Sequence, residues 1–338
     1  MKTLPELHRA LATPSAALVE DLRDTPGDIV VLGAAGKLGP SLVMLALRAL
    51  AEAGSAARVH AVSRFGDSAV ADELRAAGAH VIVADIAGDD ALAALPDAEN
   101  VILLVGAKFG TQGNEAAMWA TNTYLPGRVA ERYRSARIVA LSTGNVYPLV
   151  ATASGGASEA DPVGPVGEYA MSCLGRERVL AHAAREHGTP LALIRLNYAV
   201  EPRYGILVDL GRQILAGEPV DVTTGHVNLV WQGYANEVIL RALRHAASPE
   251  FVLNLTGPET LSTRRLAGKL GAALGRDVTI TGQEAPTALL ADAARCHALF
   301  GYPARSPDDL VRDVAEWLLA GGTVLDRPTK FQVRDGRF

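Results

Sequence analysis

The sequence predicts an α/β fold, a Rossmann-type doubly wound parallel sheet with a smaller C-terminal α/β lobe. Short apolar runs of strand length alternate with alanine-rich helical segments through the first 200 residues. This alternation is typical of a parallel sheet covered by helices on both faces. Beyond it the pattern loosens, and three further helical segments end in a polar tail from residue 321. One large domain with an attached lobe therefore fits the length of 338 residues.

The elements follow from hydrophobic period and from glycine and proline punctuation. Strands are expected at residues 29–32, 58–64, 80–85, 100–106, 137–141, 191–196 and 251–256. Helices are expected at residues 16–22, 40–54, 69–78, 115–133, 167–187, 206–216, 234–247, 262–274, 287–299 and 307–319. We assign 1–27 to a helical lead-in and 28–200 to the sheet domain, to which 233–256 returns. Segments 201–232 and 257–338 form the smaller lobe and tail.

Composition excludes several classes of protein. Hydrophobic residues make up 49% and charged residues 20% of the chain, as in a soluble globular protein. The net charge of -5, without a run of Lys or Arg, argues against a nucleic-acid partner. The sequence shows neither a signal peptide nor an apolar stretch that could span a membrane, and two cysteines suit a reducing cytoplasm. The histidine spacing gives no support for a metal site, so none is expected.

A glycine turn organises the chain. The apolar run Ile29–Leu32 leads into Gly33, Gly36 and Gly39, spaced G-x-x-G-x-x-G, and a helix follows. These glycines allow a sharp turn and bring bare amides close to a pyrophosphate, which the positive end of the following helix also favours. In this strand–turn–helix context the motif predicts a dinucleotide site.

The end of the second strand bears on which dinucleotide is bound. Arg64 lies 64 − 33 = 31 residues beyond Gly33, and Ser63 precedes it, where an NAD-preferring site usually has Asp or Glu. A hydroxyl and a guanidinium suit a 2′-phosphate, so we expect NADP, with NAD as the alternative. Arg64 could equally be an ordinary surface charge, with Asp67 binding the ribose. Lys37, inside the turn, either adds to the phosphate field or is solvated.

Four stretches in order carry a family resemblance. They are the glycine turn, Leu141-Ser142-Thr143-Gly144-Asn145-Val146-Tyr147, Tyr169-Ala170-Met171-Ser172, and Glu177 on the same predicted helix. Together they resemble the extended short-chain dehydrogenase/reductases, and more narrowly the NAD-dependent epimerase/dehydratase family. The resemblance covers roughly residues 28–320.

The resemblance implies the roles of individual residues. Thr143 and Tyr169, separated by 169 − 143 = 26 positions, would share a substrate hydroxyl or carbonyl, with Tyr169 as acid/base. Hydride transfer at a carbinol carbon requires that a proton move to or from its oxygen, which a phenol can do. The cofactor-binding set would be Gly33, Gly36, Lys37, Leu38, Gly39, Ser63, Arg64, Asp85, Ile86, Gly106, Lys108 and Asn122. The family also commonly dimerises through the helices at 115–133 and 169–187, so a homodimer is expected.

This sequence departs from the family at one position. The family places a Lys four residues after the Tyr, one helical turn away, whereas this chain has Cys173. Lowering a phenol pKa from about 10 to about 7 requires roughly 4 kcal/mol of preferential phenolate stabilisation. A neutral thiol supplies little of it. The oxidised nicotinamide is itself cationic, and Lys108 could offer a second charge.

The sequence gives weaker indications about which residues bind the substrate. The segment from Arg195 to Pro202 resembles the family's Arg-x-x-Asn-x-x-Gly-Pro, with Asn197 displaced by one position and Glu201 in place of Gly. Asn145, Asn197 and Arg203 could line a pocket for a sugar-like small molecule. Glu201 could line it too, and Trp231 with Gln232 could reach its mouth. Two functions remain open: an NAD(P)-dependent oxidoreductase, epimerase or dehydratase acting on a sugar or sugar-acid derivative, and a cofactor-binding regulator or scaffold of the same fold with little turnover.

Overall fold

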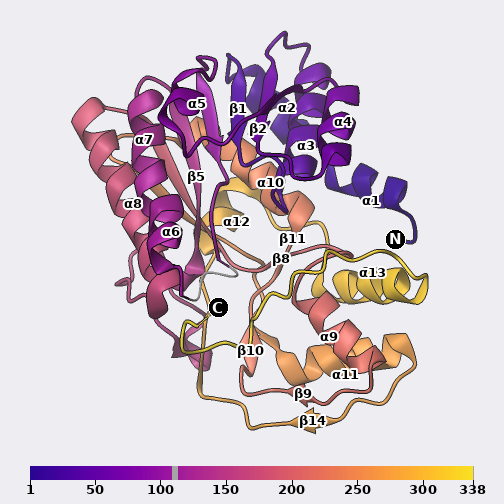
Figure 1. Cartoon of the computed structure of the whole chain (residues 1–338). Helices are drawn as coiled ribbons and strands as arrows, with labels where there is room; N and C mark the ends of the chain where they lie inside the picture. Colours follow the sequence, from indigo (N-terminus) through magenta and orange to yellow (C-terminus); the bar gives the residue numbers. More distant parts are fainter. Residues whose placement is uncertain (109–112, 338) are drawn as a thin grey trace.

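The central sheet is parallel throughout. The computed structural model describes residues 1–108 and 113–337, and within them seven strands form this sheet in the order β12-β7-β5-β4-β1-β2-β3 (Figure 1). The strands are β1 (Ile29–Leu32), β2 (Val59–Ser63), β3 (His80–Val83), β4 (Asn100–Leu103), β5 (Arg137–Thr143), β7 (Leu191–Leu196) and β12 (Phe251–Leu255). The predicted Rossmann-type α/β fold is confirmed, and the chain order reverses between β1 and β4, where such sheets bind ligands.

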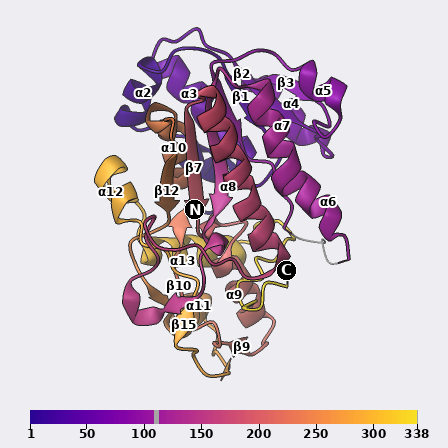
Figure 2. The same cartoon turned by 90° about the vertical axis from the view of Figure 1, so that its left-hand side faces the viewer.

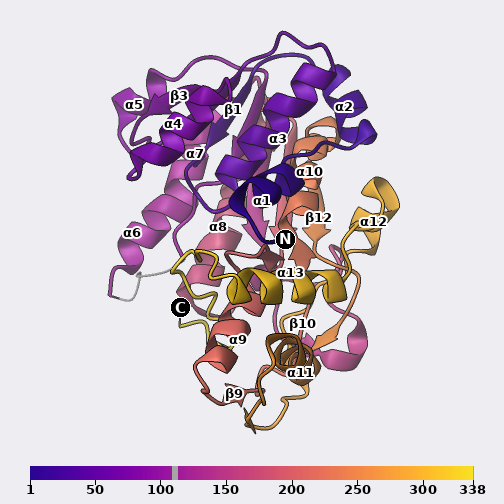
Figure 3. The same cartoon turned by 90° about the vertical axis from the view of Figure 1, so that its right-hand side faces the viewer.

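Helices cover both faces of the sheet. One face packs on α2 (Ala16–Arg23), α3 (Gly39–Glu52), α4 (Ser68–Ala76) and α10 (Gln232–Arg241), seen in Figure 3. The other packs on α5 (Asp89–Ala93), α7 (Leu125–Arg132) and α8 (Gly167–His187), seen in Figure 2. Because the inner strands are buried on both sides, their sequences read as continuous apolar runs, and all four residues of β1 are buried, whereas the edge strand β3 is partly exposed.

The long helix predicted at 115–133 is interrupted. It consists of α6 (Glu115–Trp119), a π-helical turn η1 (Ala120–Tyr124) and α7. Such π-turns insert one extra residue per turn and are frequent at functional sites. Here the turn carries Asn122, whose side chain is fully buried.

The lower part of the molecule in Figure 1 is the smaller lobe. Its helices are α9 (Ile206–Leu215), α11 (Thr263–Leu274) and α13 (Pro307–Leu319), with α12 (Ala294–Phe300) beside β12. The short strands in and beside the lobe pair two by two: β6 (Val150–Ala151) with β15 (Thr287–Ala288), β8 (Ala199–Val200) with β11 (Val230–Trp231), β9 (Val220–Asp221) with β14 (Ile280–Thr281), and β10 (His226–Val227) with β13 (Leu261–Ser262). Single 3-10 turns are η2 (Gly144–Val146), η3 (Thr152–Ser154) and η4 (Ala242–His245). The helix predicted at 287–299 is wrong in its first half, because Thr287 and Ala288 pair with β6 instead.

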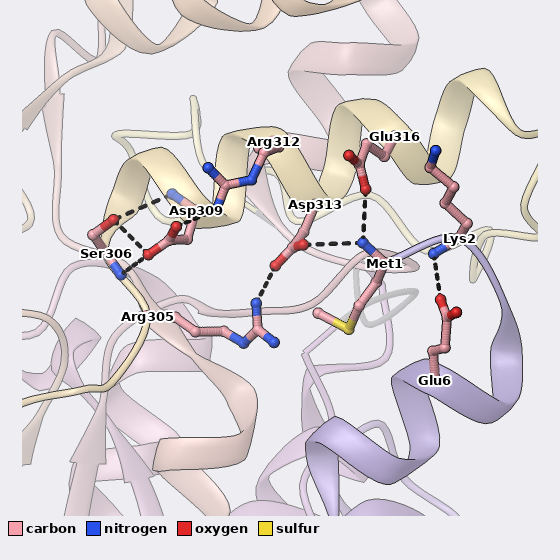
Figure 4. A network of polar contacts seen from close by, with 9 residues as sticks. All are labelled: Met1, Lys2, Glu6, Arg305, Ser306, Asp309, Arg312, Asp313 and Glu316. Atoms are coloured by element: carbon pink, nitrogen blue, oxygen red, sulfur yellow. Dashed lines mark hydrogen bonds and ion pairs between the residues drawn. The ribbon is translucent and has the colours of Figure 1, made fainter.

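The N-terminal segment joins the two parts of the molecule. It contains α1 (Leu4–Leu11), which the sequence reading missed, ahead of α2. In Figure 4 the Met1 amine donates to Asp313 Oδ1 at 3.1 Å and to Glu316 Oε2 at 2.9 Å, both on α13. Leu7 and Leu11 of α1 are buried in the core shared by α3 and α10. The start of the chain is thereby fixed to both the sheet domain and the lobe.

Residues 321–337, which we term the C-terminal strap, have no regular structure, yet the strap is firmly packed. The Leu325 amide donates to Arg203 O, and Thr329 donates from its amide and hydroxyl to Asp209 Oδ2 at 2.8 and 2.6 Å. Phe331 is only 2% exposed, and Arg334 donates twice to Thr287. The strap therefore runs from the lobe back across the junction with the sheet. Among the described residues, no helix has both the length and the apolar character needed to cross a membrane.

Candidate active site

The three glycines of the turn are under different steric constraints. Gly33 adopts φ +92°, a left-handed conformation that side chains disfavour. A Cβ on Gly39 would lie 2.3 Å from the Ala34 carbonyl oxygen, so only glycine lets α3 approach the end of β1. A Cβ on Gly36 would meet only Gly33 O, at 3.1 Å. The outward face of the turn at Gly36 is therefore open to a ligand.

One cavity of about 300 Å³ brings the predicted residues together at the carboxyl ends of the strands. Its lining includes Gly33, Gly36, Lys37, Leu38, Gly39, Gly106, Lys108, Thr143, Asn145, Tyr169 and Asn197. The glycine turn and the Thr143–Tyr169 pair, far apart in sequence, thus border the same space.

Other predicted cofactor residues lie outside that lining. Ser63 ends β2, and the exposed Arg64 follows it. Asp85 follows β3 and accepts from the Ala87 amide, and Ile86 is buried at 7% exposure. These residues share the sheet edge with the cavity but border its outer strands. Their assignment to a cofactor stays a prediction.

Tyr169 lies in a hydrogen-bond chain. Asn145 donates from its amide and from Nδ2 to Thr143 Oγ1, at 3.2 and 2.9 Å. Thr143 hydrogen-bonds the phenol, which in turn is hydrogen-bonded to Cys173. Burial raises the pKa of Tyr169 well above its usual value, the Cys173 thiol raises it further, and Arg176 and Thr143 oppose the rise. The resting phenol is therefore protonated and can act as an acid.

Asn122 and Arg176 hold the elements of the site against each other. Asn122 Oδ1 accepts from the Ala107 amide and its Nδ2 donates to Ala107 O, both at 2.8 Å. Arg176 donates to Asn122 O at 3.0 Å, to Asn122 Oδ1 at 3.1 Å and to Leu141 O at 2.6 Å. Because its amide is engaged in this way, Asn122 positions the loop after β4, and its place in the cofactor-binding set stays a prediction. Arg176, seven residues beyond Tyr169 on one helix face, was missed.

The basic side chains of Lys37, Lys108 and Arg327 line the cavity. Burial lowers the pKa of Lys37 to about 7, and the charges of Lys108 and Arg327 lower it further, while Asp209 opposes them. Burial lowers the pKa of Lys108 to about 8. Lys37 Nζ lies 3.6 Å from the centroid of the Tyr204 ring. Arg327 comes from the strap, and nothing in the polar tail sequence distinguishes it from a solvated charge.

The structure brings only some of the predicted substrate-binding residues to the first cavity. Asn197 is 2% exposed, and within the described residues neither of its amide atoms has a hydrogen-bond partner. Arg203 instead turns to the buried Glu201 beside it, at 3.0 Å, and borders a second cavity of about 480 Å³ between α1, α3, α4 and the strap. Trp231 is a core residue at 5% exposure, whereas Gln232 does reach the first cavity.

A buried polar network supports the floor of the site. Ser142 donates to Glu177 Oε1 at 2.6 Å, and Glu177 is paired with Arg195 at 2.7 Å. Arg195 donates to the Tyr147 hydroxyl, which donates to Asn254 on β12. Breaking such a buried pair by removing one partner typically costs about 3–5 kcal/mol. Among the described residues, no group of three or more His, Cys, Asp or Glu side chains could hold a metal ion.

Comparison with known families decides the relationship. Residues 29–252, from β1 to β12, match the family described as the NAD dependent epimerase/dehydratase family. The chain belongs to this family. No curated protein sequence matches the chain significantly. The strap lies outside the matched region.

Solved structures share the fold of this family member. UDP-glucuronic acid 4-epimerase from Bacillus cereus, in complex with UDP-glucuronic acid and NAD, is similar with a TM-score of 0.72 at 20% identity, covering 86% of this chain and 99% of that one. Pal from Bacillus thuringiensis gives 0.72 at 19% identity over 87% and 99%. UDP-glucose 4-epimerase from Thermotoga maritima, with UDP-glucose, gives 0.70 at 18% identity over 87% and 99%. At these identities the likeness is one of fold.

Proposed function

We propose that this protein is an NAD-dependent enzyme of the epimerase/dehydratase type that acts on a sugar nucleotide through hydride transfer. The observation that carries the proposal is the single cavity bordered by both the glycine turn and the Thr143–Tyr169 pair. The family supports a nicotinamide cofactor, and similar structures were solved with NAD and with UDP-sugars bound. They give no support to the NADP preference expected from Ser63 and Arg64, so we propose NAD.

The turn fits a dinucleotide. Gly36 leaves its outward face open, and Lys37, Lys108 and Arg327 offer positive charge beside it. Gly33, Gly36 and the α3 N-terminus would hold the pyrophosphate, as helix N-termini hold anions elsewhere. When bound, the nicotinamide would take a hydride, with its two electrons, from a carbinol carbon of the substrate.

The chain's own residues would handle the proton. Thr143 would orient the substrate oxygen. Once Tyr169 has released its own proton to solvent, the phenolate would accept the substrate hydroxyl proton as the C–O bond becomes a carbonyl. In the reverse direction Tyr169 returns that proton. Asn197, with both amide atoms unpartnered among the described residues and 2% exposure, is suited to bind polar groups of the sugar nucleotide. An unsatisfied buried amide costs about 1–3 kcal/mol, which a substrate hydrogen bond would recover.

Cys173 favours the second candidate, a cofactor-binding regulator with little turnover. Burial raises the pKa of this thiol, so it carries no charge to promote ionisation of the phenol. Calorimetric titration with NAD and NADP, followed by chromatographic analysis of a panel of UDP-sugars for epimerised, dehydrated or oxidised products, separates the two candidates. Turnover on any sugar supports the enzyme, binding without turnover supports the regulator, and absence of binding rejects both.

A further inference from the structure

The charge that position 173 lacks is present elsewhere in the site. Lys108 follows β4, and its Nζ lies 5.5 Å from the centroid of the Tyr169 ring. The Cys173 sulfur lies close enough to act on this ammonium electrostatically. Lys108 therefore reaches, from a loop, the same space that a lysine at position 173 would reach from within α8.

Both ends of Lys108 are held. Its backbone follows Ala107, which Asn122 clamps through two hydrogen bonds of 2.8 Å. Its Nζ lies 3.5 Å from the carbonyl oxygen of Thr329 on the strap. Thr329 is itself 4% exposed and bonded to Asp209. The ammonium is thus placed by the π-turn on one side and by the strap on the other.

Arg176 is a second cation near Tyr169. It lines the same cavity, and its charge lowers the pKa of the phenol. Its Nε and both terminal nitrogens donate to Asn122 and Leu141, so the guanidinium is held by these acceptors. Lys108 lies in the cavity with its Nζ over the Tyr169 ring.

We propose that Lys108 supplies the positive charge that stabilises the Tyr169 phenolate, in place of the helix lysine that this chain has exchanged for Cys173. This inference rests on the proposed function, in which Tyr169 is the acid/base. Lys108 acts through the phenol and is therefore a positioning residue. The charged and titratable groups that face it are Lys37 from the glycine turn, Cys173 and Tyr169 from α8, and Lys330 from the strap.

The test reads the ionisation of one phenol directly. Difluorotyrosine placed at position 169 has a lower pKa than tyrosine, which brings its titration to a milder pH, and its fluorine resonance is unique in the protein. The titration is followed by fluorine NMR with and without NAD. An opposite charge at about 4–6 Å shifts a pKa by about 1–3. Lys108→Met should therefore raise the midpoint by up to that amount, the shift being largest where the phenol titrates below the Lys108 pKa of about 8. Lys108→Arg should leave it near the wild-type value, and Cys173→Lys in the Lys108→Met background should bring it back.

Lys269→Met is the matched control, because Lys269 is an exposed lysine on α11 paired with Asp308. It should leave the midpoint unmoved. Lys108→Gln repeats the test if Lys108→Met does not fold. An unchanged midpoint in a folded Lys108 variant overturns the inference. Failure of the wild type to bind NAD would instead reject the proposed function, while the cofactor-free titration would still report on Lys108.

Discussion

The phenol of Tyr169 offers the most direct test at the scale of single residues. It hydrogen-bonds Thr143 and Cys173, and in the proposed function its hydroxyl is the group that moves the substrate proton. Tyr169→Phe should lower turnover by about two to four orders of magnitude, because general acid–base catalysis contributes about that much. Affinity for NAD should stay nearly constant. Steady-state rates with a calorimetric titration check both expectations, and unchanged turnover would remove Tyr169 from the mechanism.

The lowered pKa of Lys37 predicts that the affinity for the cofactor depends on pH. Its pKa in the free protein is about 7, below the ordinary 10.5, and that of Lys108 is about 8. A bound pyrophosphate favours the charged ammonium and so raises both values. Between the free and bound pKa, binding takes up protons, and affinity should fall as pH rises from about 7 to about 9, by up to tenfold per pH unit for each lysine.

Calorimetry in buffers of different ionisation enthalpy measures this proton uptake. In Lys37→Met the dependence should be shallower, whereas Lys269→Met should retain the wild-type slope. A wild-type affinity that is constant over this range would show that these lysines do not meet the phosphates.

At the level of residues, the sequence predicts which side chains border one cavity where the spacing between two elements decides it, and predicts less where a neighbouring side chain decides. Thr143 ends β5 and Tyr169 begins α8, so their separation carries the information, and both border the cavity. Arg203 was a reasonable pocket residue by chemistry, but the buried carboxylate of Glu201 takes its guanidinium. The sequence alone does not reveal which of several nearby acids an arginine meets.

At the scale of elements, two glycines at the junction of β1 and α3 should have separable effects, one on stability and one on cofactor binding. In Gly39→Ala the new Cβ would lie 2.3 Å from Ala34 O, so the helix must move off the strand. We expect a loss of about 1–3 kcal/mol or more in the free energy of unfolding. In Gly36→Ala the Cβ meets only Gly33 O at 3.1 Å, so stability should change little while NAD affinity falls sharply.

Denaturant unfolding and NAD titration distinguish the two variants. Gly268→Ala serves as the control, since a Cβ there meets nothing within 4 Å. Equal losses of stability in Gly36→Ala and Gly39→Ala would contradict the division of roles.

Elements were predictable where both faces of a strand are buried, because continuous apolar runs such as Ile29–Leu32 have few other interpretations. The interruption of 115–133 was not predictable in this way, since its π-turn is fixed by bonds from Asn122 to Ala107 and Ser172. Likewise Thr287 and Ala288 leave the helical pattern to pair with β6, a partner more than a hundred residues away in sequence.

At the scale of the whole molecule, the strap makes the cavity depend on the end of the chain. Arg327 and Thr329 line the cavity, and Arg327 acts on Lys37. Arg327 is exposed, so Arg327→Ala should leave unfolding unchanged within about 0.5 kcal/mol. It should weaken NAD binding, and the loss should shrink with added salt. Arg312→Ala, an exposed arginine on α13, is the control, and an affinity equal to wild type would exclude the strap from the cofactor site.

The outer side of α8 and the π-turn beside it carries exposed apolar side chains. Tyr124 is 67% exposed, Met171 is 38% exposed, and Val166 just before α8 is 42% exposed. Helix α8 packs on η1 and α7, and we expect two copies to associate through these helices with Tyr124, Met171 and Val166 at the contact. Burying such side chains contributes about 25 cal/mol for each Å² of apolar area removed from water.

A charge at the centre of that face should therefore separate the copies. We predict a dimer by light scattering for the wild type, and a monomer for the double variant Tyr124→Glu with Met171→Glu, because each carboxylate would have to leave water. Tyr302→Glu is the control, since Tyr302 is 73% exposed beyond the end of α12, away from this face. A wild type that stays monomeric at high concentration, or a double variant that stays dimeric, would place association elsewhere or abolish it. Because Tyr169 lies on the same helix as Met171, the dimer would also hold the acid/base side of the cavity rigid, and the double variant should lose turnover in step with assembly.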